Sequence, residues 1–159
     1  MKREEFFGYI KNIATLGRVG YFPASGTVAT AATVPLMLLI KLLFSPRTEF
    51  FILLIATFVS GFIIDYVLAR MPRPLVSSDA LQEYDPPHIV LDELIGCLWA
   101  FYGITISWNK LVVGFFLFRF FDIFKPFGID ALQRLPGAWG ILADDVLAGL
   151  YTALILFFI

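Results

Sequence analysis

The sequence predicts an all-helical integral membrane protein, built as a compact bundle of about four to five membrane helices with an amphipathic helix at its amino terminus. Of the 159 residues, 59% are hydrophobic, 18 are phenylalanine and only 16% are charged, which is too apolar for a typical water-soluble domain. The apolar residues gather in five segments separated by polar breaks, and backbone groups in hydrocarbon are best satisfied within helices. Charged residues concentrate at the segment edges. We therefore expect a single membrane-embedded domain over residues 1–159.

The first predicted element is an interfacial helix over residues 1–16. Phe6, Phe7, Ile10 and Ile13 recur at helical spacing on one face, and charged residues surround the other face. This pattern is typical of a helix that lies in the plane of the membrane surface. A glycine-rich loop follows over residues 17–27.

The five apolar segments are the predicted membrane helices, over residues 28–44, 50–69, 92–108, 110–124 and 141–159. The turn at Ser45-Pro46-Arg47 ends the first segment, and a long polar connection separates the second from the third. The third and fourth segments are short for a span of about 20 residues. They are therefore tilted, packed inside the bundle, or a re-entrant pair.

The basic residues predict the orientation of the bundle. If all five segments cross, the side of the amino terminus carries nine of the 12 basic residues: Lys2, Arg3, Lys11, Arg18, Arg70, Arg73, Arg119, Lys125 and Arg134. Cytoplasmic loops are enriched in lysine and arginine, so we expect the amino terminus in the cytoplasm. The same threading brings seven acids to that side: Asp65, Asp85, Asp92, Glu93, Asp122, Asp144 and Asp145. A re-entrant pair at 92–124 leaves the side of the acids unchanged.

Two acidic doublets, Asp92-Glu93 and Asp144-Asp145, stand at the heads of the third and fifth segments. Acids in a first helical turn are favoured by the helix dipole, which is the purely structural interpretation. Adjacent carboxylates repel each other, however, and ionised groups beside hydrocarbon are usually kept for a function. Two doublets on one side favour a bound divalent cation.

A second constellation joins Arg119 and Asp122, three residues apart on one helix face, to Lys125 at the segment end. In one interpretation, Arg119 and Asp122 form an ion pair and Lys125 extends to the membrane interface. In the other, Asp122 is a metal ligand, and Arg119 and Lys125 bind phosphate oxygens. Gly26 and Thr27 likewise either start a helix as a simple cap or offer donors to phosphate. Asp65 is expected to be functional, or to pair with a nearby arginine.

Other residues exclude several chemistries. The single cysteine, Cys97, has glycine rather than arginine six positions later, which excludes a cysteine-phosphatase loop. The single histidine, His88, excludes histidine-nucleophile lipid phosphatases. What remains is hydrolysis by metal-activated water with carboxylates as ligands and base. No basic run predicts nucleic-acid binding, and nothing requires a protein partner.

Four motifs, in order, resemble the phosphatidylglycerophosphatase A family: GYFPASGT at 20–27, DPPHIVLDELIG at 85–96, FRFFDIFKP at 118–126 and LPGAWGILADD at 135–145. The resemblance implies a magnesium-dependent enzyme of the bacterial inner membrane. Such an enzyme removes the terminal phosphate of phosphatidylglycerophosphate, giving phosphatidylglycerol. The bilayer and this lipid are then the expected partners, and the active site is expected to face the cytoplasm.

On this hypothesis the residues divide into four roles. Glu93, Asp92 and Asp145 are catalytic, with Glu93 the first choice for positioning water. Asp92, Asp122, Asp144 and Asp145 hold Mg²⁺. Arg119, Lys125 and Thr27 contact phosphate, and Asp85, Asp65 and Gly26 give support. Two alternatives remain: a small membrane cation transporter lined by the acids, or a non-catalytic membrane subunit that uses them for assembly.

Overall fold

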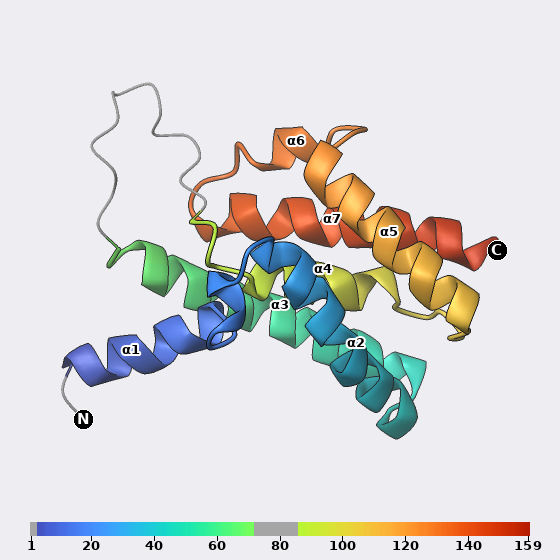
Figure 1. Ribbon diagram of the computed structural model, residues 1–159, viewed down its shortest axis with the longest axis horizontal. Coiled ribbons are helices and arrows are strands. Elements are labelled where there is room, and N and C mark those ends of the chain that lie inside the picture. The colour runs from blue at the N-terminus through green and yellow to red at the C-terminus, as the bar shows by residue number, and fades with distance from the viewer. Residues whose placement is uncertain (1–2, 72–85) are drawn as a thin grey trace.

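The computed structural model describes residues 3–71 and 86–159, which form seven α-helices, one short 3-10 helix and no strand (Figure 1). The elements are α1 (Arg3–Ala14), η1 (Val19–Tyr21), α2 (Ser25–Leu43), α3 (Pro46–Leu68), α4 (Leu91–Ala100), α5 (Trp108–Phe124), α6 (Ile129–Leu132) and α7 (Ala138–Phe157). Three of them, α2, α3 and α7, are long and apolar enough to cross a membrane. The prediction of an all-helical membrane protein is confirmed.

Helix α1 is amphipathic and packs against the end of the bundle. Phe7 and Ile10 pack with α3 against a buried cluster, while Tyr9 and Ile13 are exposed. Glutamates stand in its first turn and Lys11 in its last turn, which suits the helix dipole. The Ala14 carbonyl accepts the Val90 N–H at 3.0 Å, so the end of α1 is tied to the chain entering α4.

Helices α2 and α3 form a hairpin closed at the end remote from α1. Ser45 caps α3, with its hydroxyl accepting the Thr48 N–H at 3.4 Å, and Pro46 occupies the first helical position, where no N–H is needed. Lys41 Nζ lies 3.1 Å from Glu49 Oε1, and this pair is largely buried. The charges of Lys41 and Glu49 are therefore neutralised within the hairpin.

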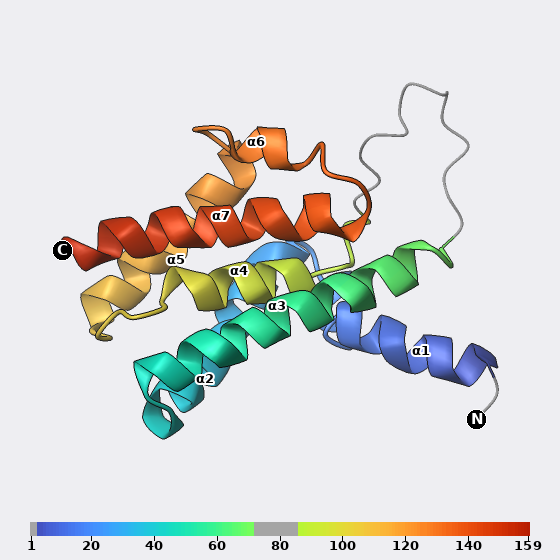
Figure 2. The same cartoon turned by 180° about the vertical axis from the view of Figure 1, so that it is seen from behind.

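Helix α4 is the centre of the fold. Figure 2 shows it between α3 and α7, and eight of its ten residues are buried. Ten residues rise about 15 Å, half of a hydrocarbon core of about 30 Å. The segment expected over 92–108 is thus a half-length helix followed by a non-helical stretch at 101–107, where Gly103 has φ +69°. Helix α4 is packed inside the bundle, which is one of the three arrangements expected for this segment.

Close backbone contact joins α4 to α7. A Cβ on Gly149 would collide with the Gly96 carbonyl oxygen, and a Cβ on Gly96 would lie 2.6 Å from the carbonyl oxygen of Asp145. Only glycine at these positions lets the two backbones approach so closely. This contact sets the spacing between the acids of the two helices.

Several helix boundaries differ from those expected, and two of the differences bear on the predicted site residues. Helix α2 begins at Ser25 rather than residue 28, so Thr27 lies inside its first turn and is not a cap. Helix α7 begins at Ala138 rather than residue 141, after Gly137 turns the chain at φ +64°. Asp144 and Asp145 are therefore its seventh and eighth residues, and the interpretation that they cap a first turn is wrong because the dipole effect fades within that turn.

Candidate active site

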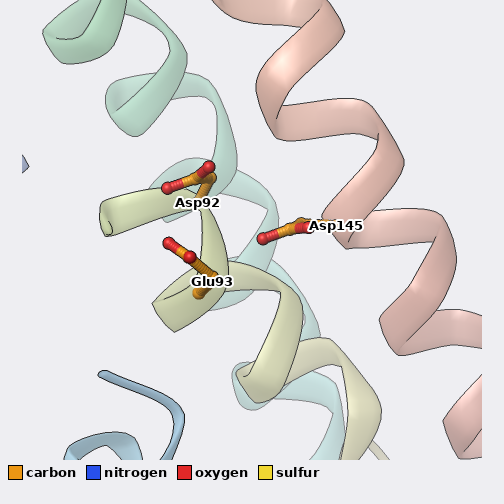
Figure 3. A group of neighbouring side chains, drawn as sticks. All are labelled: Asp92, Glu93 and Asp145. Carbon is orange, nitrogen blue, oxygen red and sulfur yellow. The ribbon is translucent and has the colours of Figure 1, made fainter. Parts of the chain in front are cut away.

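Three carboxylates from two helices meet inside the bundle. Asp92 and Glu93 stand in the first turn of α4, and Asp145 projects from the second turn of α7 toward them (Figure 3). One oxygen from each carboxylate lies within 4.8 Å of the others. Asp92 and Asp145 are buried, with 5% and 3% of their surfaces exposed. We call Asp92, Glu93 and Asp145 the carboxylate group.

The chemistry of this group fits a divalent cation. Glu93 Oε2 and Asp145 Oδ2 are buried and have no hydrogen-bond partner within the described residues. Buried unpaired carboxylate oxygens are costly, and like charges at this spacing repel. Hard cations such as Mg²⁺ take carboxylate oxygens as ligands. Within the described ranges, Asp92, Glu93 and Asp145 are thus the group of acids that could hold a metal ion.

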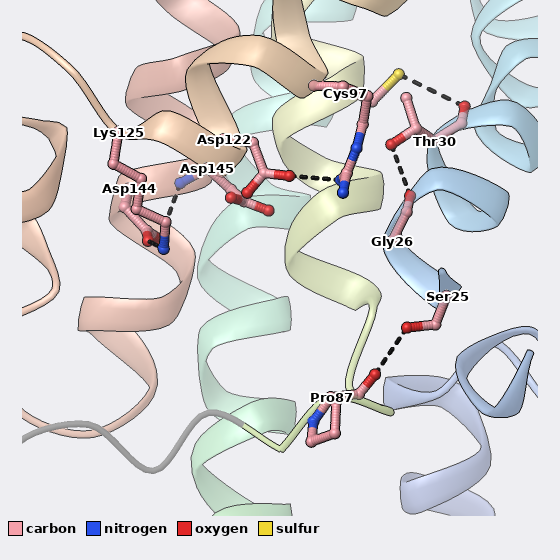
Figure 4. A network of polar contacts seen from close by, with 10 residues as sticks. Ser25, Gly26, Thr30, Pro87, Cys97, Asp122, Lys125, Asp144 and Asp145 are labelled. Atoms are coloured by element: carbon pink, nitrogen blue, oxygen red, sulfur yellow. Dashed lines mark hydrogen bonds and ion pairs between the residues drawn. The ribbon is translucent and has the colours of Figure 1, made fainter. Parts of the chain in front are cut away.

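Asp144 faces a different set of partners (Figure 4). Its Oδ2 accepts hydrogen bonds from Lys125 Nζ at 2.5 Å and Gln133 Nε2 at 3.0 Å, and its Oδ1 accepts the Asp145 N–H at 2.9 Å. One helical residue turns the side-chain direction by about 100°, which is why the adjacent acids point apart. Asp144 therefore anchors the loop after α5 to α7.

Lys125 completes that anchor from the end of α5. It adopts φ +47° as the residue after the helix, which brings its ammonium back toward α7. Burial alone would lower the pKa of the Lys125 ammonium, but its hydrogen bond to Asp144 and the nearby carboxylate charges raise that pKa above the ordinary value. Lys125 is therefore a cation that is already paired with Asp144. Its contact with a phosphate stays a prediction.

Arg119 and Asp122 form an ion pair on the last turns of α5, beside the carboxylate group. The Arg119 Nε has no hydrogen-bond partner within the described part of the chain. The charge of Asp122 acts on both Glu93 and Asp145. The structure thus brings an arginine with an unused donor next to the buried acids.

The amino terminus of α2 closes the site from the opposite side. A Cβ on Gly26 would collide with Glu93 Oε1 and lie 2.9 Å from Arg119 Nη1, so glycine is required for this approach. Ser25 fixes the helix start by donating to the Pro87 carbonyl oxygen at 2.7 Å. Thr27 is half-buried in the same turn. Gly26 is therefore part of the site's wall.

The remaining predicted residues lie elsewhere or outside the described ranges. Asp65 is exposed on α3, where its Oδ1 lies 3.0 Å from the position of a Cβ on Gly137, and no described contact joins it to the carboxylate group. Asp85 lies outside the described residues. His88 stacks on Tyr21 with ring centres 5.5 Å apart, as a packed loop residue.

Sequence reasoning missed Gln133. It follows the short helix α6, and Gly140 lets this stretch pass close to α7, because a Cβ there would lie 2.7 Å from the Gln133 carbonyl oxygen. An uncharged residue in a loop carries no sequence signal of its own. The nearest hint is its place between Lys125 and Asp144, which the fold brings together.

Comparisons with known proteins agree with the motifs. Phosphatidylglycerophosphatase A of Haemophilus influenzae is 41% identical over 76 residues, which cover 46% of this chain and 47% of the relative. The Escherichia coli protein of the same name is 38% identical over 78 residues, covering 48% and 45%. A Bacteroides thetaiotaomicron protein named putative phosphatidylinositol-3-phosphatase is 36% identical over 75 residues, covering 45% and 47%. In these alignments the chain spans about half the length of the curated relatives it matches.

No solved structure matches the chain. The sequence model of one family, described as phosphatidylglycerophosphatase A, matches residues 12–159. Because that match runs through every element that builds the site, the chain belongs to the phosphatidylglycerophosphatase A family.

Proposed function

We propose that this protein is a Mg²⁺-dependent lipid phosphatase that hydrolyses the terminal phosphate of phosphatidylglycerophosphate to phosphatidylglycerol and phosphate. The observation that carries the proposal is the carboxylate group, three acids within 4.8 Å of one another, beside Arg119 in an apolar helical bundle. Relatives named for this activity support the choice of substrate. Phospholipid biosynthesis is then the process it serves.

Asp92, Glu93 and Asp145 would hold Mg²⁺, with Asp122 close enough to act on the group electrostatically. When bound, the ion would supply positive charge for the phosphoryl oxygens and would activate water. Hydrolysis forms a bond from the water oxygen to phosphorus and breaks the bond from phosphorus to the glycerol oxygen. That oxygen takes up the proton released by the water and leaves as the hydroxyl of phosphatidylglycerol. Glu93, with Oε2 unpaired, is our candidate to position that water and accept its proton.

Cations and hydrogen-bond donors lie around the carboxylate group, where the phosphate would bind. Arg119 has its Nε available, and a guanidinium suits phosphate oxygens through its fork of donors. The first turn of α2 brings Gly26 next to Glu93 and Arg119, and backbone N–H groups of this turn, with the Thr27 hydroxyl, would add further donors. Lys125, held by Asp144, would contribute charge from the other edge.

The membrane arrangement follows from the same proposal. The acids of α4 and α7 lie near the helix ends that follow the cytoplasm-facing loops in the orientation predicted by the basic residues. In a bacterial inner membrane, the lipid phosphate would reach the site from the cytoplasmic leaflet while the acyl chains stay in the bilayer. The protein would act without an obligatory protein partner.

The two alternatives are weaker on the geometry. A cation transporter needs an acid-lined path, whereas Arg119 and Lys125 beside the acids raise the electrostatic barrier to a cation. A non-catalytic subunit would use its acids for assembly, whereas Asp92 and Asp145 are buried within a single chain. A second candidate substrate, phosphatidylinositol 3-phosphate, comes from the relative named putative phosphatidylinositol-3-phosphatase.

The deciding experiment measures phosphate release by the purified protein in mixed micelles, with Mg²⁺ or EDTA. Asp145→Asn is the test variant, and Asp130→Asn, which changes an exposed acid of α6, is the matched control. We expect magnesium-dependent release that is lost in Asp145→Asn and kept in Asp130→Asn. Phosphatidic acid and phosphatidylinositol 3-phosphate are the comparison substrates. No release from any of them by folded protein would overturn the proposal, and faster release from either comparison lipid would reassign the substrate.

A further inference from the structure

A cleft of about 540 Å³ opens between the first turn of α1 and the end of α3. It is lined by Arg3, Glu4, Phe7, Ala69 and Arg70, none of which belongs to the carboxylate group or to its surroundings. The volume lies within the range of small-ligand sites, about 300–1,000 Å³. We call it the α1–α3 cleft.

Arg70 is held in place at this cleft. Its guanidinium lies 3.6 Å from the centre of the Tyr66 ring, and Nη1 donates to the Tyr66 carbonyl oxygen at 3.1 Å. Phe6 in turn packs edge-on against Tyr66 with ring centres 5.8 Å apart. A guanidinium has five N–H donors, so an arginine fixed by these two contacts keeps donors to offer to a ligand.

The charge of the cleft favours an anion. Among the described residues of its lining, Arg3 and Arg70 supply two cations against the one carboxylate of Glu4. Phe7 and Ala69 add an apolar part to the lining. A ligand with a charged phosphate and an apolar continuation would match both parts.

The position of the cleft selects the kind of ligand. Helix α3 is long and apolar enough to cross a membrane and ends at Leu68, so Ala69 and Arg70 would lie where the helix emerges from the hydrocarbon. Helix α1 is amphipathic and packs beside that end, with Tyr9 exposed. Basic pockets at the ends of membrane helices meet lipid head groups.

We propose that the α1–α3 cleft is a second lipid site, which binds the phosphodiester of an anionic phospholipid through Arg3 and Arg70. The site does not require the proposed phosphatase activity and adds to it. An anionic lipid held there would fix α1 against the end of α3 at the membrane surface.

The test is lipid binding by the full chain in detergent, followed by native mass spectrometry. Phosphatidylglycerol and phosphatidylcholine with identical acyl chains are the two probes. We expect tighter retention of phosphatidylglycerol, weakened about fivefold in Arg3→Gln or Arg70→Gln and about thirtyfold in the double variant, from the usual contribution of one interfacial cation. Arg47→Gln removes an exposed arginine at the opposite end of α3 and should leave binding unchanged.

Two further measurements keep the outcome unambiguous. Circular dichroism and thermal melting check that the double variant folds. If the double variant does not fold, Arg70→Lys, which keeps the charge but not the planar fork, is tested in its place. Asp145→Asn should bind phosphatidylglycerol at the cleft like wild type, so a failure of the phosphatase proposal leaves this test intact. Binding within twofold of wild type in the double variant, or equal retention of the two lipids by wild type, would overturn the lipid site.

Discussion

Lys125 at the end of α5 and Asp144 in the second turn of α7 are joined by an ion pair of 2.5 Å, and Gln133 donates to the same carboxylate oxygen at 3.0 Å. These contacts hold the loop containing α6 against α7. They also separate the roles of two neighbouring acids, since Asp144 is occupied by the loop and Asp145 faces α4.

Removing the cation from this pair should destabilise the fold. Lys125→Met leaves a buried carboxylate without its cation, at a cost of about 3 kcal/mol, whereas Gln133→Met removes one hydrogen bond to a charged group, at about 1–2 kcal/mol. Unfolding by SDS titration in mixed micelles measures both losses. Lys125→Met/Asp144→Leu should recover most of the stability because both charges are gone. A Lys125→Met protein as stable as Arg134→Met, which changes an exposed neighbouring cation, would contradict the anchor.

The wall formed by Gly26 gives a second prediction. In Gly26→Ala the added methyl group displaces Glu93 and crowds Arg119, and a displacement of about 1 Å in a catalytic group lowers turnover by as much as about 100-fold. Phosphate release under saturating lipid measures the effect. Gly8→Ala is the control, because a Cβ there meets nothing within 4 Å. Full activity in Gly26→Ala would remove this helix end from the site.

Magnesium should stabilise the folded protein independently of any substrate. A ligand that binds only the folded state adds about 2.7 kcal/mol at 100 times its dissociation constant, so the melting temperature should rise with Mg²⁺. Differential scanning fluorimetry in detergent measures the rise. Asp145→Asn should lose it, while Asp130→Asn should keep it. An equal rise in Asp145→Asn would place the ion away from the carboxylate group.

The glycine contact between α4 and α7 supports both stability and activity. Gly149→Ala forces the two backbones apart at the Gly96 carbonyl, and overpacking of this kind costs about 1–3 kcal/mol. Because the same contact sets the distance from Asp145 to the acids of α4, turnover should fall with it. Thermal melting and phosphate release are the measurements, and Leu150→Ala, on the exposed side of α7, is the control. Turnover unchanged by Gly149→Ala would show that this spacing is not critical.

The site could be predicted from the sequence where charged residues stand beside apolar segments. The doublets at 92–93 and 144–145 stand out because ionised residues are rare beside apolar segments. Three of those four acids, Asp92, Glu93 and Asp145, meet in the carboxylate group. The amphipathic spacing of Phe7 and Ile10 likewise predicted the helix now seen as α1. These signals depend only on local pattern and polarity.

Other features depend on contacts that no local pattern reports. The apolar stretch after Ala100 continues through Ile104 and Ile106, so hydropathy could not indicate that α4 stops. The rotation of α7 about its axis determines whether Asp144 or Asp145 faces α4. The contact of Gly149 with α4 fixes that rotation. Gln133 acquires its partner only when the loop folds back.

One feature of α4 reaches beyond catalysis. Past its acids, the helix is surrounded by tightly packed apolar side chains, including Ile95, Leu98, Phe118 and Leu142. In a bilayer this packing would leave water and ions no path from the carboxylate group to the far end of α4. Under the proposed function, the lipid would therefore enter and leave the site on the side of the bundle where the acids lie.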